Sequence, residues 1–458
     1  MNFPRYHVAL VRPYPADDKR NMMNFSKSNF LREKAKQLIP GGCHTYSKGD
    51  DQFPQLSPGF ISKGQGAKVW DVDGNEFLDW GMGLRSVCLG HAYKDVLAEV
   101  AMQLELGVNF TRPSDIEVEL AEKLCGIIDS IEMVKFTKNG SDATTAAVRL
   151  ARAYTGKSLV LRCVNQPFFS VDDWFIGNTV MSSGVPEETK KLTYNFPFND
   201  ETALESLLVS LHGNVACIIL EVVATERPKK SFLSKVRELC NKNNIVLIVD
   251  EIISGFRFDL KGAQHKYGIT PDLTTFGKAM ANGFSVAALG GKREIMKLGG
   301  LDHKQERVFL LSSTNGAETH CLRAALKTID ILEKTDFIDE NWSIGRRLKK
   351  GSNEIARGFG IEKYAFMGGL CISPTINFLD KSGQADAGLR TLFLQETIKK
   401  GILIPYVSIS ASHREQELEK TIDAFQHALK IISDAISVGD LSHFLIGSHV
   451  KPVFRKFN

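Results

Sequence analysis

Three short apolar runs constrain the fold of this chain more than any other feature of its sequence. SLVLRC (158–163), ACIILEVV (216–223) and NIVLIVDEI (244–252) are brief and rich in β-branched residues. Helical segments separate them, including SKVRELCNKN (234–243). Buried strands that alternate with helices are typical of a parallel sheet with helices on both faces. We therefore expect an α/β fold.

Other patterns extend this prediction along the chain. VWDVDGNEFLDW (69–80) alternates around Asp73-Gly74 and predicts a β-hairpin. Further strands are expected at 286–291, 307–313, 371–378 and 402–410, and further helices at 92–106, 115–129, 318–335 and 414–436. The last strands and helix of this series predict a second, smaller α/β domain.

The length of 458 residues also favours two domains, because one compact core rarely needs so many. We expect a loose, proline-broken tail over residues 1–25 and an N-terminal segment over 26–85 that contributes to the small domain. The large domain is expected over 86–330, and the rest of the small domain over 331–458.

Composition argues against several kinds of partner. The net charge is +4 with both signs interspersed, so no nucleic-acid surface is expected. No apolar run has the length of a membrane helix, and the first residues lack the apolar core of a signal peptide. The eight cysteines are scattered without a C-x-x-C pair, which favours free thiols in a reducing compartment. We expect a cytoplasmic protein with no metal site.

A glycine turn is the first candidate for chemistry. Asn139-Gly140-Ser141 stands between a predicted strand and a helix that begins near Asp142. A glycine turn at a helix N-terminus presents free backbone N–H groups and the positive end of the helix dipole, which suits a phosphate. An ordinary turn with a capping side chain is the alternative, and the motif alone does not exclude it.

An acidic residue and a lysine follow in order. In NIVLIVDEIISGFRF (244–258), Asp250-Glu251 ends the predicted buried strand, where a strand of an open α/β sheet would face a ligand crevice. Lys278 stands in TFGKAMANGFSVAALGG (275–291), among glycines and small residues. A phosphate turn, a strand-end aspartate and such a lysine together meet the needs of pyridoxal phosphate: an anion site, a partner for the ring nitrogen and an amine for a Schiff base.

The chain resembles the class III, fold-type I aminotransferases from about residue 30 to 436, most closely the glutamate-1-semialdehyde aminomutase branch. The motifs that carry the resemblance are LIPGG (38–42), AKVWDVDGNEFLDW (67–80), LGHAY (89–93), AAVRLARAYTGK (146–157), VDEIISGFRF (249–258) and GITPDLTTFGKAMANGFSVAALGGKREIM (268–296). The resemblance implies a mostly parallel sheet in a large three-layer domain plus a smaller α/β domain, with pyridoxal 5'-phosphate as the cofactor.

Family roles are implied at the matching positions. Lys278 resembles the lysine that binds the cofactor and moves the substrate proton, and Asp250 resembles the partner of the ring nitrogen. The remaining implied contacts are Gly140 and Ser141 with the phosphate, Glu221 beside the cofactor, and Thr314 with the phosphate of a partner subunit's cofactor. The last of these implies a homodimer with shared active sites.

The sequence departs from the family where substrate binds. QPFFSVDDWF (166–175) replaces the usual Gly-Tyr-His-Gly segment, and alignment puts Phe168 at the ring-stacking position. In the aminomutases an arginine after LIPGG holds the substrate carboxylate, whereas this chain has Lys48 there and Thr45 at the nearby serine position. An ammonium does not reproduce the bidentate grip of arginine. Arg85, where the family has Trp-Gly-Pro, is the alternative cation.

We therefore predict an aminotransferase that moves an amino group from a small-molecule donor to a small polar carbonyl acceptor, such as a sugar-like aldehyde or ketone. The alternative within the family is the aminomutase itself, which moves the amine within one molecule. A non-catalytic scaffold is a further alternative, against which the intact Lys278 and Asp250 argue. No G-x-G-x-x-G opens a helix, which argues against a nicotinamide oxidoreductase.

Overall fold

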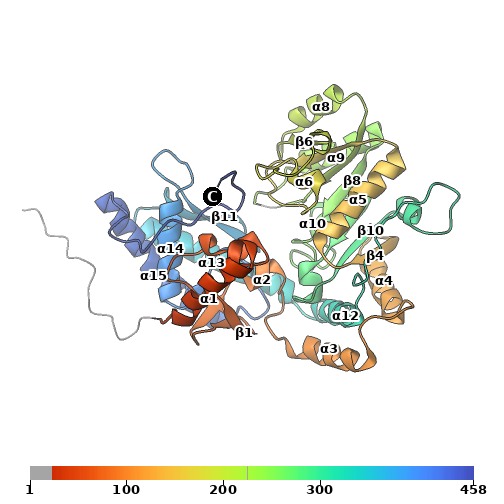
Figure 1. Ribbon diagram of the computed structural model, residues 1–458. Coiled ribbons are helices and arrows are strands. Elements are labelled where there is room, and N and C mark those ends of the chain that lie inside the picture. Colours follow the sequence, from red (N-terminus) through yellow and green to blue (C-terminus); the bar gives the residue numbers. More distant parts are fainter. Residues whose placement is uncertain (1–22, 224, 458) are drawn as a thin grey trace, which may run out of the picture.

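A seven-stranded sheet forms the centre of the large domain (Figure 1). The computed structural model describes residues 23–223 and 225–457, so most of the predicted N-terminal tail lies outside the described residues. The strands, in spatial order, are β4 (Met133–Thr137), β10 (Ala287–Gly291), β9 (Leu273–Phe276), β8 (Val246–Asp250), β7 (Val215–Leu220), β5 (Leu159–Cys163) and β6 (Thr193–Phe196). Strand β10 runs antiparallel to both of its neighbours, and the other pairs are parallel. The mostly parallel sheet predicted from the apolar runs is confirmed.

Helices cover both faces of this sheet, because consecutive side chains of a strand point to opposite sides. On β7, Cys217 and Ile219 pack into the core cluster that contains α5, whereas Ile218 and Leu220 pack into the cluster that contains α9. The helices of the large domain are α3 (Lys94–Leu106), α4 (Asp115–Ile127), α5 (Gly140–Thr155), α6 (Asp173–Ile176), α7 (Glu187–Lys190), α8 (Glu201–Ser210), α9 (Lys230–Asn243), α10 (Ala263–Tyr267), α11 (Arg293–Met296) and α12 (Thr319–Glu333).

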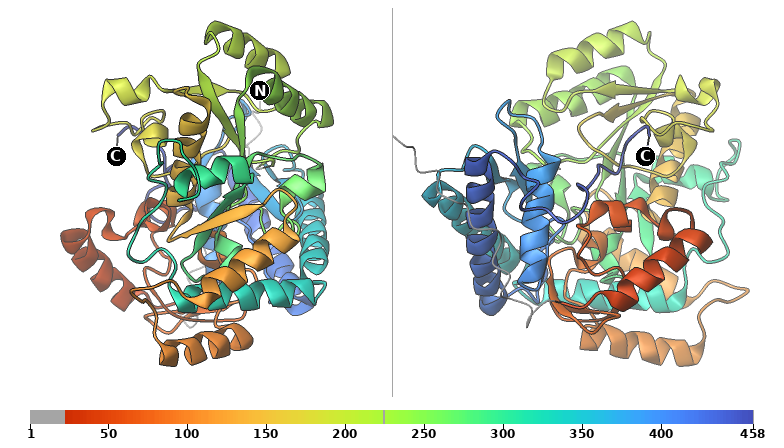
Figure 2. Two further views of the ribbon diagram at one scale, coloured as in Figure 1. Left: turned by 90° about the vertical axis from the view of Figure 1, so that its right-hand side faces the viewer. Right: turned by 60° about the vertical axis from the view of Figure 1, so that its left-hand side comes forward.

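The small domain combines the two ends of the described chain. One core cluster joins Leu78 and Trp80 with Phe393 and Phe425. Its strands are β1 (Ile61–Gln65), β2 (Lys68–Asp71), β3 (Glu76–Asp79) and β13 (Ile402–Leu403) in one sheet, with β11 (Ala365–Leu370) and β12 (Ser373–Phe378) as a separate pair. Its long helices are α13 (Phe337–Gly358), α14 (Ala387–Lys399) and α15 (Glu415–Val438), which lie together beside the large domain (Figures 1 and 2). The domain boundaries at residues 85 and 330 stay predictions.

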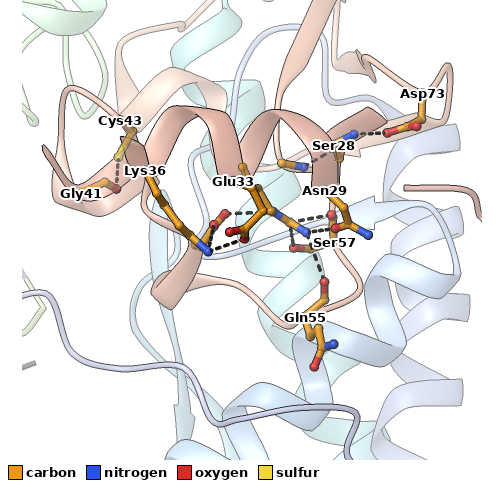
Figure 3. Close-up of polar contacts among 12 residues, drawn as sticks. Ser28, Asn29, Glu33, Lys36, Gly41, Cys43, Gln55, Ser57 and Asp73 are labelled. Atoms are coloured by element: carbon orange, nitrogen blue, oxygen red, sulfur yellow. Dashed lines mark hydrogen bonds and ion pairs between the residues drawn. The ribbon is translucent and has the colours of Figure 1, made fainter. Parts of the chain in front are cut away.

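The predicted hairpin at 69–80 is confirmed, since β2 and β3 pair antiparallel around Asp73-Gly74. The tip of this hairpin also forms hydrogen bonds to the start of the first helix, α1 (Ser26–Leu38). The carboxylate of Asp73 accepts the backbone N–H groups of Lys27 at 2.7 Å and Ser28 at 2.9 Å. Figure 3 shows the Ser28 bond at the start of α1. This carboxylate caps a helix that has no capping side chain of its own.

One predicted strand is wrong. Residues 307–313 contain no strand, and a single backbone bond, from Val308 N–H to the Leu298 carbonyl at 2.9 Å, holds their start. The segment is apolar because Leu310, which is 5% exposed, covers the core cluster of α5. The strand expected at 402–410 is much shorter, because only β13 pairs within it.

Candidate active site

Three side chains lie where three neighbouring strands end. Strands β7, β8 and β9 are adjacent and parallel, so their carboxyl ends share one edge of the sheet. Glu221 follows β7, Asp250 ends β8, and Lys278 follows β9 after Gly277. Open α/β sheets bind their ligands outside this edge. The chain thus places these three predicted site residues on adjacent strand ends.

Asp250 is held by one of its two carboxylate oxygens. Its Oδ1 accepts the Ile252 N–H at 2.9 Å and the Thr275 hydroxyl at 3.0 Å. No hydrogen bond to Oδ2 is recorded from any residue that the structure describes. Burial raises the pKa of Asp250 to about 6, although the Ile252 N–H and the charge of Lys278 oppose this rise. The carboxylate is therefore fixed in orientation, mostly ionised at pH 7, and has one oxygen available to a ligand.

Lys278 is a half-buried amine with a perturbed acidity. Burial lowers its pKa to about 8, while the carboxylates of Asp250 and Glu221 act in the opposite direction. Its backbone has a φ of 43°, which is uncommon for a residue with a side chain. A lysine with a depressed pKa is a far better nucleophile near neutral pH than an ordinary one.

Glu221 is held through its backbone by a residue that the sequence did not single out for any role. The Gln166 amide donates to the Glu221 carbonyl at 2.6 Å and accepts the Glu221 N–H at 2.8 Å. Burial, and then the nearby charge of Asp250, raise the pKa of Glu221 to about 8. Glu221 is therefore mostly neutral at pH 7 and offers a hydroxyl donor beside Lys278.

The glycine turn lies against the same region. Helix α5 begins at Gly140, and the Asn139 side chain accepts the Asp142 N–H at 3.0 Å, so the turn is capped as its ordinary interpretation requires. A Cβ atom built on Gly140 would lie 2.9 Å from Ile252 Cδ1, and one on Gly277 would lie 3.1 Å from the same atom. One isoleucine, two residues after Asp250, therefore packs against both the turn and the residue before Lys278.

Ser141 and Phe168 lie around this turn. The Ser141 hydroxyl accepts the Val171 N–H at 3.2 Å, which ties the 166–175 segment to the start of α5. Phe168 is 44% exposed and packs edge-on against Phe175, with ring centroids 5.7 Å apart. Its neighbour Phe169 is only 2% exposed, so Phe168 is the ring of this pair with a face available to a ligand.

Arg85 stands on a left-handed turn, α2 (Met82–Arg85). The Cζ of its guanidinium lies 4.4 Å from the ring centroid of Tyr406, a residue that the sequence analysis did not predict. Burial lowers the pKa of Arg85, whereas Tyr406 and Glu221 raise it through their charges, so the guanidinium lies in electrostatic range of Glu221.

Three residues predicted for the site have no recorded contact with Asp250, Glu221 or Lys278 within one chain, among the residues that the structure describes. Thr45 and Lys48 lie on the 3-10 turns after α1, and Lys48 is exposed. No recorded contact of either side chain involves Asp250, Glu221 or Lys278 within the described residues. Thr314 is exposed, and its carbonyl accepts the Asn109 amide at 2.9 Å.

Metal-binding clusters and membrane-spanning helices are both absent from the described residues. No group of three or more His, Cys, Asp or Glu side chains in this part of the chain could hold a metal ion. Within residues 23–223 and 225–457, no helix combines the length and the apolar character that crossing a bilayer requires.

The chain is similar to known proteins over most of its length. The family model described as aminotransferase class-III matches residues 52–405. A relative from Methanobrevibacter smithii, named glutamate-1-semialdehyde 2,1-aminomutase, is 33% identical over 89% of this chain and 98% of its own length. A relative from Cloacimonas acidaminovorans, named 3-aminobutyryl-CoA aminotransferase, is 34% identical over 89% of this chain and 97% of its own length.

Solved structures agree with this assignment of the fold. The FumI protein of Sphingopyxis sp. MTA144, in what is described as its PLP internal aldimine form, matches with a TM-score of 0.82 and 25% identity. The match covers 90% of this chain and 97% of that chain.

Proposed function

The chain belongs to the class III aminotransferase family, and on that premise we propose that it moves an amino group from a small-molecule donor to a small polar carbonyl acceptor. Its cofactor is pyridoxal 5'-phosphate, as in the family. The observation that carries the proposal is the meeting of Glu221, Asp250 and Lys278 at three adjacent strand ends. An acceptor of sugar-like aldehyde or ketone character is part of the proposal.

The residues around these strand ends fit the cofactor. Its ring withdraws electrons from the substrate carbon that loses a proton, which is the chemistry the cofactor supplies when it is bound. The Oδ2 atom of Asp250 would accept a hydrogen bond from a protonated ring nitrogen. The Oδ1 atom accepts the two hydrogen bonds that fix the orientation of the carboxylate. Gly140 begins α5, where free backbone N–H groups suit a phosphate, and its missing Cβ lets Ile252 pack against the turn, since a Cβ there would lie 2.9 Å from Ile252 Cδ1.

Lys278 has two roles in this proposal. Its amine would bind the cofactor covalently, and within each half-reaction the freed amine would take a proton from one carbon and return a proton to another. Both roles require a neutral amine, and burial favours that form by lowering the pKa of Lys278 to about 8. Glu221 remains beside it as a neutral hydrogen-bond donor, because its own pKa is raised to about 8.

Other side chains complete the proposed site. Phe168 would stack on the ring through its exposed face, and Ser141 would bind the phosphate. Thr314 would reach the phosphate in a partner subunit, so a homodimer with shared sites belongs to the proposal. The exposure of Thr314 supports a role outside its own subunit.

The substrate-binding residues we propose are Arg85, with Lys48 and Thr45 on the N-terminal segment. Arg85 lies in electrostatic range of Glu221 and stacks on Tyr406, which supports the first assignment. A cytoplasmic location is proposed as well. It is supported by the eight cysteines, all of which are free.

The aminomutase is the second candidate, since the Methanobrevibacter smithii relative carries that name. Sequence identity does not favour it, because the Cloacimonas acidaminovorans relative, named 3-aminobutyryl-CoA aminotransferase, is 34% identical to this chain against 33% for the aminomutase. The segment after LIPGG, where Lys48 stands instead of the arginine of the aminomutases, favours the first candidate.

One screen tests the proposal. The purified holoenzyme is mixed with single amino donors, and the loss of the pyridoxal absorbance is followed; each reactive donor is then paired with candidate aldehydes and ketones that restore it. We expect at least one donor and one polar carbonyl acceptor to cycle the absorbance. Sustained formation of 5-aminolevulinate from glutamate-1-semialdehyde alone, without added donor or acceptor, would establish the aminomutase instead.

A further inference from the structure

Arg257 is a fully buried arginine without a carboxylate partner. It is 2% exposed, and no ion pair of its guanidinium is recorded among the residues described. Its donors bind three backbone carbonyls instead: Ile409 at 2.7 Å, Arg85 at 2.8 Å and Val87 at 3.2 Å. Burying an unpaired cation costs free energy, and the hydrogen bonds to these carbonyls offset part of that cost. All of them fix the backbone of two distant segments.

The first of these segments is strained. Met82, Gly83, Leu84 and Arg85 have φ values of 44°, 59°, 59° and 67°, which form one left-handed turn. Each residue with a side chain costs about 1–2 kcal/mol in this conformation. Strained backbone persists only where surrounding contacts determine it, and such strain gathers at functional sites. The two bonds from Arg257 to the carbonyls of Arg85 and Val87 clamp the end of this turn.

The second segment forms the other wall around Arg85. Ile409 follows Tyr406 by three residues, and the Tyr406 ring lies under the Arg85 guanidinium at 4.4 Å. One buried side chain therefore joins the turn that carries Arg85 to the segment that carries its stacking partner. Arg257 itself comes from the loop after β8, seven residues beyond Asp250.

The left-handed turn carries Arg85, whose guanidinium N–H groups have no recorded hydrogen-bond acceptor among the described residues. No side-chain hydrogen bond or ion pair of Arg85 is recorded within residues 23–223 and 225–457, although it lies in electrostatic range of Glu221 and Lys278. The nearby charges at pH 7 are Lys278, Arg85 and Arg257 against Asp250, because Glu221 is mostly neutral. This site has a surplus of positive charge, and the planar fork of arginine suits a carboxylate.

We propose that Arg257 is a positioning residue, which holds the left-handed turn and Tyr406 so that Arg85 binds an anionic group of the substrate. The inference rests on the proposed function and deepens it, because it assigns an anionic group to the substrate and names what orients its receptor. Arg257 does not touch the substrate; it acts through the backbone of residues 85–87 and 409.

Binding of a non-reacting anion to the holoenzyme tests this. Succinate and its uncharged analogue succinamide are titrated calorimetrically against the wild type, Arg85→Gln, Arg257→Gln, Arg257→Lys and the Arg85→Gln/Arg257→Gln double variant. We expect the wild type to prefer succinate by about 10- to 100-fold, the range of a charge-assisted hydrogen-bonded pair. Arg85→Gln and Arg257→Gln should each lose most of this preference, and the double variant should lose no more than Arg85→Gln alone.

Controls separate positioning from folding. Arg152→Lys changes a partly buried arginine of α5, which donates to the Ser158 carbonyl at 2.9 Å, and should leave the succinate preference unchanged. Thermal unfolding and the visible absorbance of the bound cofactor are recorded for every variant. If Arg257→Gln fails to fold, Arg257→Lys decides the question, because it keeps the charge and loses the geometry that spans three carbonyls.

Three results would overturn the inference. One is a wild type that binds succinate no better than succinamide. The second is an Arg257 variant that folds, binds cofactor and keeps the full preference for succinate. The third is a double variant whose losses add. Failure of the proposed function is distinguishable, since it would appear in the donor and acceptor screen as a holoenzyme whose absorbance no donor and acceptor pair cycles, whatever its preference for succinate.

Discussion

At the residue scale, burial gives three ionisable groups their distinct protonation states. Asp250 has a pKa raised to about 6 and is mostly charged at pH 7, whereas Glu221 has a pKa raised to about 8 and is mostly neutral. Lys278 has a pKa lowered to about 8, so a useful fraction of its amine is neutral. One charged carboxylate, one neutral carboxyl group and one nucleophilic amine therefore share a single sheet edge.

Replacing Asp250 tests the first of these states. Asp250→Asn keeps an acceptor for the Ile252 N–H and the Thr275 hydroxyl but removes the negative charge. We expect kcat to fall by about 10²–10³-fold, comparable to the loss of one preorganised electrostatic partner in other active sites.

Glu251→Gln is the matched control, because this buried carboxylate accepts the Ala263 and Gln264 N–H groups at the start of α10 instead. It should lower the melting temperature and leave the cofactor absorbance as in the wild type. Equal losses of kcat in Asp250→Asn and Glu251→Gln would contradict the assigned role of Asp250.

The depressed pKa of Lys278 predicts how cofactor binding depends on pH. Only the neutral amine attacks, and with a pKa of about 8 its fraction rises from about one-tenth at pH 7 to about nine-tenths at pH 9. The rate of cofactor attachment to the apoprotein, followed by stopped-flow absorbance, should rise about tenfold over this range and then level off. A rate that keeps rising tenfold per pH unit to pH 10, as for free lysine, would show an unperturbed amine.

Two residues of the candidate site, Asp250 and Lys278, were predicted from the sequence because each lies within a long motif. Asp250 and Lys278 stand in runs whose order along the chain already suggested one chemistry. Gln166, Tyr406 and Arg257 were not assigned roles, since their partners lie 55, 321 and 172 residues away in the chain and only the fold brings them together. The sequence did contain an indication for Arg257, because an arginine between two phenylalanines in a predicted buried motif must find hydrogen-bond acceptors inside the protein.

At the element scale, the β-strand periodicity of β7 and the turn before α5 explain how the site is built. The alternation along β7 fills a core on each face, which leaves the strand ends free to carry polar side chains. Apolar runs revealed β5, β7 and β8 for this reason. The same signal was misleading at 307–313, where apolar side chains cover the core without any strand partner, and hydropathy does not distinguish the two cases.

Gly140→Ala tests the turn. The new Cβ would lie 2.9 Å from Ile252 Cδ1, so the turn or the isoleucine must shift. We expect the dissociation constant of the cofactor to rise by about 10-fold or more, because an error near 1 Å at a binding group costs up to about 10²-fold. Equilibrium dialysis with pyridoxal phosphate measures the change.

Gly126→Ala is the control for this substitution. Gly126 lies in α4 with nothing within 4 Å of an added Cβ, so alanine should stabilise the helix by about 0.5–1 kcal/mol and leave cofactor affinity unchanged. An unchanged dissociation constant in Gly140→Ala would argue against a phosphate site at this turn.

At the scale of the whole molecule, the C-terminal segment after α15 ties together parts that are distant in sequence. It crosses from the small domain toward the large sheet (Figure 2). Ile446 N–H donates to the Gln395 side chain at 2.9 Å, and Lys451 N–H donates to the Asp51 carbonyl at 2.8 Å. Phe454 then packs against the core cluster of α5. The segment therefore joins α14, the N-terminal segment and the large domain.

Removing residues 440–458 should destabilise the protein. The deletion exposes small-domain core contacts of Leu441, Phe444 and Val450 and breaks the ion pair of Arg455 with Asp51 at 2.6 Å. We expect a loss on the order of 3–5 kcal/mol, visible as a fall of about 5 °C or more in melting temperature. Deleting only the last three residues should change little. A full deletion that melts with the wild type would show that this segment contributes no stability.

The central claim is that Lys278 binds the cofactor, and reduction with borohydride tests it most directly. The holoenzyme is treated with borohydride, digested and analysed by mass spectrometry. The account predicts one pyridoxyl phosphate adduct, on the peptide that contains Lys278, and no adduct after the Lys278→Ala substitution. An unmodified Lys278 in protein saturated with cofactor, or an adduct confined to another lysine, would contradict it.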